Sequence, residues 1–129
     1  MREEVAQELT CVERQYGELD VDAESAWMIV VRYPLPPGWN KPETKILVII
    51  PPGYPTTPPD NFYTDDDLRL ADGSQAANAS PGQSVAGGTW QQFSYHVQPG
   101  EWRPHAEPLR GDNLLTYMAA IGRRLSEVE

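Results

Sequence analysis

Apolar residues recur at helical spacing near both ends of the chain. An apolar stripe predicts a helix over residues 2–16 that ends at Gly17; the stripe consists of Val5, Leu9, Val12 and Tyr16. A second stripe predicts a helix over residues 112–126 with Asp112 as its N-cap; its members are Leu114, Leu115, Met118, Ile121 and Leu125. The chain therefore begins and ends with amphipathic helices that need a common core.

Between the two helices, runs of β-branched and aromatic residues predict strands. The predicted strands are a short edge strand over residues 19–21 and longer strands over 26–33, 44–50, 60–64 and 89–97. The connection over residues 34–44 is typical of a hairpin. Strands in sequence followed by a helix favour an α+β domain with an antiparallel meander and helices on one face.

Two segments interrupt this order. A proline-rich corner over residues 51–59 follows a strand, and it cannot continue the sheet because proline lacks a backbone donor. Residues 65–88 show little apolar periodicity, so we predict a long irregular flap there, of the kind that is usually functional or mobile. The three aspartates at 65–67 fit a solvated turn better than a cation site, because other acidic groups lack calcium-loop spacing.

The last predicted strand places its side chains on two sides. If the segment is extended, Trp90, Gln92, Ser94 and His96 share one side, and Gln91, Phe93, Tyr95 and Val97 share the other. Ser94 and His96 would then stand roughly 6–7 Å apart at Cα. They are either a reactive pair or ordinary polar residues of a solvated strand face.

Charge and composition exclude several kinds of function. The net charge of −9 and only ten Lys and Arg residues argue against nucleic acid as a partner. One cysteine, Cys11, and two histidines, His96 and His105, are too few for a convincing metal site. We interpret Cys11 as an incidental, half-exposed thiol. No apolar run has membrane-spanning length and no signal peptide is visible, so we expect no membrane partner and a cytoplasmic protein.

Three landmarks resemble ubiquitin-conjugating enzymes over nearly the whole chain. They are the Tyr-Pro-Thr-Thr-Pro-Pro corner at 54–59, the Trp-Arg-Pro turn at 102–104, which is similar to the Trp-Ser-Pro turn of that family, and the helix over 112–126. The resemblance is strongest to a bacterial branch, prokaryotic family E of the superfamily. It implies one ubiquitin-conjugating (UBC)-like domain over residues 1–129, of α+β class, with an N-terminal helix, a β-meander, a long flap and a C-terminal helix.

The chain departs from that family at the reactive centre. The nucleophilic cysteine of the family lies about eight residues before the Trp of its Trp-Ser-Pro turn, and that position is Ser94 here. The His-Pro-Asn element, whose asparagine supports the oxyanion, is also missing. Asn78 is the flap asparagine in this sequence, and its surroundings do not match that element.

The resemblance leads to an enzymatic hypothesis. Ser94 would accept a ubiquitin-like protein from an activating enzyme as an oxyester and pass it to a lysine amine of a protein substrate. A serine hydroxyl needs a general base, and His96 is the nearest candidate. Trp90, Trp102 and Arg103 would shape the site. No cofactor is implied, since the activating enzyme would consume the ATP.

The alternative hypothesis is a non-catalytic adaptor that binds a ubiquitin-like protein or the activating enzyme, which the missing cysteine and asparagine favour. In either case the resemblance implies that the N-terminal helix docks the activating enzyme. The exposed face expected for this helix is equally well explained as solvated; it consists of Arg2, Glu3, Glu4, Gln7 and Glu8. Tyr54 and Trp39 are either partner anchors or corner aromatics that pack inward.

Overall fold

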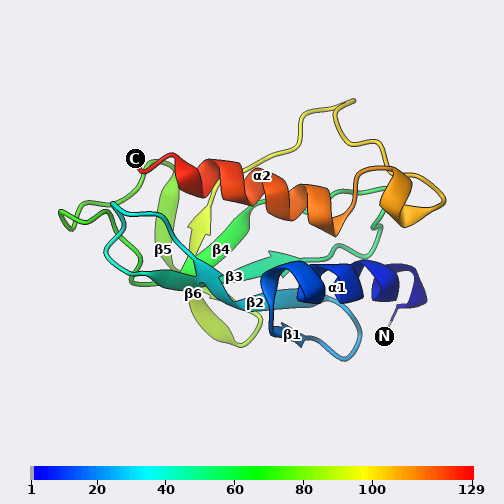
Figure 1. The fold of residues 1–129 in the computed structure, drawn as a ribbon, viewed down its shortest axis with the longest axis horizontal. Helices are drawn as coiled ribbons and strands as arrows, with labels where there is room; N and C mark the ends of the chain where they lie inside the picture. Colours follow the sequence, from blue (N-terminus) through cyan, green and yellow to red (C-terminus); the bar gives the residue numbers. More distant parts are fainter. Residues whose placement is uncertain (1) are drawn as a thin grey trace.

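A computed structural model describes residues 2–129 as two helices packed on an antiparallel sheet (Figure 1). The elements in chain order are α1 (Glu3–Tyr16), β1 (Leu19–Val21), β2 (Trp27–Pro34), β3 (Glu43–Ile49), β4 (Phe62–Asp65), β5 (Ala79–Val85), β6 (Gly88–Phe93), the 3₁₀ turn η1 (Pro108–Arg110) and α2 (Leu114–Ser126). The α+β class and the UBC-like arrangement predicted from the sequence are confirmed.

The sheet has six strands in the order β1-β2-β3-β4-β6-β5, and every neighbouring pair is antiparallel. Figure 1 shows α1 and α2 side by side across one face of this sheet. The main core fills the space between the helices and that face; its largest members include Tyr117, Phe62 and Phe93. On the other face a smaller cluster buries Ile29, Leu47, Tyr63 and Trp90.

The predicted flap is in part a strand, which corrects the sequence analysis. Residues 79–85 form β5, an edge strand that pairs with β6 and closes a hairpin at Ala86 and Gly87. The sequence hides this strand because it contains Pro81 and Gly82, and its register shifts between Ser80 and Gln83. Proline and glycine are tolerated at an edge and at a bulge, where the sheet does not need every backbone donor.

The sequence analysis is also corrected at the start of α2. The N-cap is Asn113 and not Asp112: its side chain accepts hydrogen bonds from the backbone N–H groups of Leu115 and Thr116 at 2.8 and 3.1 Å. The Thr116 hydroxyl in turn accepts from the Asn113 N–H at 2.9 Å, which completes a capping box. Asp112 instead accepts a hydrogen bond from the Arg103 N–H and so fixes the loop before the helix.

This correction gives a prediction for stability. Asn113→Ala should lower the free energy of unfolding by about 1–2 kcal/mol, because two backbone donors lose their acceptor. Asp112→Ala should cost less, about 0.5–1 kcal/mol, because one loop hydrogen bond is lost. Urea denaturation followed by circular dichroism measures both values. The reverse ranking would show that Asp112 caps the helix after all.

Within residues 2–129, no helix is long and apolar enough to cross a membrane. The same part of the chain holds no group of three metal-ligating side chains. Asp65 and Asp67 of the aspartate run both form ion pairs with Lys41, at 2.7 and 2.8 Å. The run is therefore tied to a lysine on the neighbouring loop.

Candidate functional site around Ser94

Ser94 is the first residue after β6, and its side chain is exposed. Its N–H donates to the carbonyl of Asn78 at 3.0 Å, so it continues the β5–β6 ladder by one step. Tyr95 and Val97, which alternate with Ser94 and His96 along the chain, pack against the main core. The backbone is therefore extended beyond the end of β6, and the side chains of Ser94 and His96 both lie on the exposed side.

On the other edge of this segment the pairing slips by one residue. Phe93 pairs with Phe62 in β4, so the regular register would pair Ser94 with Asn61. Asn61 instead pairs with Tyr95, whose carbonyl accepts the Asn61 N–H at 2.7 Å. The side chain of Asn61 accepts the Tyr95 N–H at 3.1 Å in return. Ser94 is the extra residue between these two pairs. Extra residues of this kind locally bend a strand and redirect side chains, and they are frequent beside active sites.

His96 pairs with an acidic residue that sequence reasoning missed. Its Nδ1 lies 2.6 Å from Oδ1 of Asp60, the residue that follows the proline corner. Among the hydrogen bonds of residues 2–129, none joins Ser94 to His96. No sequence signal could have indicated Asp60, because it lies 36 residues before His96 and sits in no recognisable motif with it.

Trp102 attaches the segment after Ser94 to the proline corner. Its Nε1 donates to the carbonyl of Pro55 at 2.7 Å, and its ring lies 6.2 Å from that of Tyr54, centroid to centroid. Arg103 is exposed, and its Nε donates to the Gly100 carbonyl at 3.2 Å. The Trp-Arg-Pro turn thus holds the 94–104 segment in place from the side of the sheet that carries the helices.

Trp90 lies elsewhere. Its indole belongs to the cluster on the face of the sheet away from the helices, whereas Trp102 packs against the main core. The structure therefore does not bring Trp90 and Trp102 together around one site. The Nε1 of Trp90 is buried and has no hydrogen-bond partner among the described residues.

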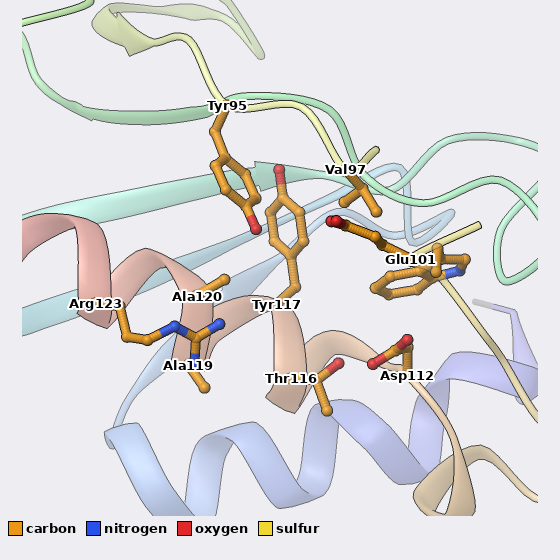
Figure 2. Close-up of a pocket in the computed structure, with 10 residues that line it drawn as sticks. Tyr95, Val97, Glu101, Asp112, Thr116, Tyr117, Ala119, Ala120 and Arg123 are labelled. Carbon is orange, nitrogen blue, oxygen red and sulfur yellow. The ribbon is translucent and has the colours of Figure 1, made fainter. Parts of the chain in front are cut away.

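A pocket of about 300 Å³ lies between the 95–102 segment and α2. Figure 2 shows the rings of Tyr95 and Tyr117 close together there, with the Glu101 carboxylate and the Arg123 guanidinium reaching in from either side. Ser94 and His96 are not part of its lining, so the pocket and the two candidate catalytic residues occupy opposite sides of the segment.

Three of the predicted partner contacts lie at or near α1. Glu3 and Glu4 are exposed in its first turn, but Arg2 is half-buried and donates hydrogen bonds to the carbonyls of Ser25, Ile50 and Pro51. Arg2 therefore fastens the start of α1 to the loop after β3. Its guanidinium therefore donates its hydrogen bonds to carbonyls of the same chain.

The structure corrects the predicted exposure of Tyr54 and Glu8. Tyr54 is 3% exposed and packs in the main core, so its ring does not face a partner; the inward alternative describes it. Its hydroxyl donates to the carboxylate of Glu8, which is only 1% exposed, although the sequence analysis placed Glu8 on the solvated face. Trp39 is likewise 6% exposed, and its Nε1 donates to the Leu125 carbonyl at 3.0 Å.

Ser94 carries an exposed hydroxyl, its backbone is bonded to that of Asn78, and two residues later His96 pairs with Asp60. Asn78 is the direct neighbour of Ser94 across the β5–β6 ladder, a context that was not visible in the sequence because β5 was not predicted. A hydroxyl beside an imidazole that a carboxylate orients is the minimum set for nucleophilic acyl transfer. The same set is also compatible with a solvated polar edge.

One comparison with known proteins gave a match. A family model described as prokaryotic E2 family E matches residues 5–128, which is nearly the whole chain. No curated protein and no solved structure matches this chain.

Proposed function

The chain belongs to prokaryotic E2 family E. From this premise we propose that Ser94 accepts a ubiquitin-like protein from an activating enzyme as an oxyester. The protein then transfers it to a lysine amine of a protein substrate. The observation that carries this proposal is the position of Ser94. It is the exposed extra residue between the Phe62–Phe93 and Asn61–Tyr95 pairs, and it lies two residues before His96. Across the β5–β6 ladder its neighbour is Asn78. We place the reaction in the cytoplasm, and the protein needs no cofactor of its own.

The first step exchanges a thioester for an oxyester. The Ser94 Oγ attacks the carbonyl carbon that joins the ubiquitin-like protein to the cysteine of the activating enzyme. The new C–O bond forms and the C–S bond breaks. The hydroxyl proton passes to His96 Nε2 and from there to the departing thiolate. In the second step a neutral lysine amine attacks the ester carbonyl carbon, the new C–N bond forms and the C–O bond breaks. The proton that the amine nitrogen loses passes to Ser94 Oγ, which leaves as the free hydroxyl.

A second function, the non-catalytic adaptor, is favoured by one observation. The hydrogen bond of His96 goes to Asp60 and not to Ser94, as expected for a polar edge with no nucleophile to activate. As an adaptor, the protein would bind a ubiquitin-like protein or the activating enzyme without forming a covalent adduct.

One experiment separates the two functions. The purified protein is mixed with an activating enzyme and a ubiquitin-like protein from the same genome and ATP, and adducts are resolved on gels with and without hydroxide or thiol. The oxyester proposal expects an adduct that hydroxide removes and thiol does not, absent in Ser94→Ala. Ser94→Cys, made together with Cys11→Ala, should give a thiol-sensitive adduct.

Ser84→Ala is the matched control, because Ser84 is an exposed serine of the same hairpin. It should form the adduct at the wild-type level. Binding without an adduct in any variant would replace the oxyester proposal by the adaptor. An adduct that survives Ser94→Ala would mean that another residue is modified, and Cys11 would be tested next.

A further inference from the structure

We propose that Asp60 is a positioning residue for the reaction at Ser94: it holds His96 in the tautomer whose Nε2 is free to accept the proton of the Ser94 hydroxyl. This inference rests on the proposed function of Ser94. It adds a residue that lies 36 positions away in the sequence and reaches His96 only through the fold.

The Asp60–His96 contact rests on a fixed backbone. Asn61, next to Asp60, donates its N–H to the Tyr95 carbonyl at 2.7 Å and accepts the Tyr95 N–H through its side chain at 3.1 Å. The Asn61 carbonyl accepts the hydroxyl of Tyr117 in α2 at 2.6 Å. Three hydrogen bonds therefore fix the two residues adjacent to Asp60 and His96. Such a frame sets the two side chains opposite each other although both are largely exposed.

The contact also selects one tautomer. An ionised carboxylate can only accept hydrogen bonds, so an Nδ1 that lies 2.6 Å from Asp60 Oδ1 must carry the proton. In the neutral imidazole Nε2 then has a free lone pair, which is what a general base needs. Once Nε2 has taken a proton, the same carboxylate stabilises the imidazolium, as the buried aspartate does in serine hydrolases.

Ser94 lies on the same side of the extended segment as His96. With Nδ1 turned to Asp60, Nε2 points away from that carboxylate and can meet the Ser94 hydroxyl directly or through one water, since such contacts often tighten only when the substrate is bound. The Asp60 charge also acts on two phenols, those of Tyr63 and Tyr117. Burial, with the Asp60 charge as a lesser cause, raises the pKa of both Tyr63 and Tyr117, so both stay neutral.

The tautomer can be measured on the free protein. In ¹⁵N-edited NMR spectra of the imidazoles, neutral His96 should be protonated at Nδ1. Asp60→Asn should shift it toward the Nε2–H form, because the asparagine amide can donate to Nδ1. Asp20→Asn is the matched control, since Asp20 is an exposed aspartate in β1, at the far edge of the sheet. An unchanged tautomer in Asp60→Asn would overturn the proposal.

The rate of oxyester formation is the second readout. In a single turnover with the charged activating enzyme, Asp60→Asn should slow the formation of the Ser94 adduct by about 10–100-fold, and Asp60→Glu should recover part of the rate. A wild-type rate in Asp60→Asn, with the adduct present, would overturn the role of Asp60 and leave the oxyester intact. No adduct in the wild-type protein would overturn both.

Discussion

Replacing Glu8 by alanine is expected to lower the free energy of unfolding by about 3 kcal/mol. Glu8 is buried in α1, and one of its oxygens, Oε1, accepts the hydroxyl of Tyr54 and, at 3.0 Å, the N–H of Leu114. These bonds join α1 to the proline corner and to the first residue of α2. Alanine would leave two buried donors without an acceptor. Urea denaturation at pH 7 measures the loss.

The pH dependence tests the same residue more sharply. Burial raises the pKa of the Glu8 carboxyl, although the hydrogen bonds from Tyr54 and Leu114 oppose this shift. A folded-state pKa above the unfolded value means that the folded state binds the proton more tightly. The contribution of Glu8 to stability is therefore greatest below the unfolded value, falls as pH rises through the folded pKa, and is level above it.

Glu8→Gln is the matched variant, because the amide oxygen can accept both donors and does not ionise. The wild-type free energy of unfolding should fall relative to that of Glu8→Gln between the unfolded and the raised folded pKa. Urea curves recorded at several pH values from 3.5 to about 8 provide the comparison. Two parallel pH profiles would show that the Glu8 carboxyl titrates alike in the folded and unfolded chains.

Trp102→Ala is expected to cost about 2–3 kcal/mol and to release the segment after Ser94. The indole is half-buried, its Nε1 donates to the Pro55 carbonyl, and its ring contacts Tyr54. Without it, the turn at 102–104 loses its attachment to the proline corner. Hydrogen exchange of the 94–104 amides should accelerate more than that of β2 and β3, and adduct formation on Ser94 should slow.

Two further variants separate the contributions of Trp102. Trp102→Phe keeps an aromatic ring and loses the hydrogen bond, so it should cost about 1 kcal/mol. Arg103→Ala is the control, because the side chain is exposed and its loss should change stability by no more than about 0.5 kcal/mol. Equal exchange rates in Trp102→Ala and Arg103→Ala would contradict the anchoring role of the indole.

The sequence predicted those parts of the fold that depend on periodicity. Both helices and five of the six strands were predicted from the sequence, and the alternation along residues 90–97 placed Ser94 and His96 on the same side of the last predicted strand. β5 was missed because proline and glycine interrupt it, and pairing with β6 supplies the order that its own residues lack. Glu8 was misplaced because its burial depends on Tyr54 and Leu114, which meet it only in the folded chain.

The candidate site was less predictable for the same reason. Ser94 was found by counting from a family landmark, and His96 by its distance of two residues. Asp60 and Asn78 lie just before β4 and β5, the two strands that flank this segment, so nothing local marks them. A pairing between distant segments is a property of sheet order and register, and a single sequence does not state either.

The pairing on both edges of the Ser94 segment has a consequence for how an acyl intermediate could be stabilised. Many acyl-transfer enzymes direct backbone N–H groups near the nucleophile at the developing oxyanion. Here the N–H of Ser94 is bonded to Asn78 and that of Tyr95 to Asn61. Neither can turn toward a tetrahedral intermediate without losing its present hydrogen bond. Its negative charge would have to be met by a side chain, by water or by the protein that delivers the acyl group, so the rate of transfer would depend on what is docked.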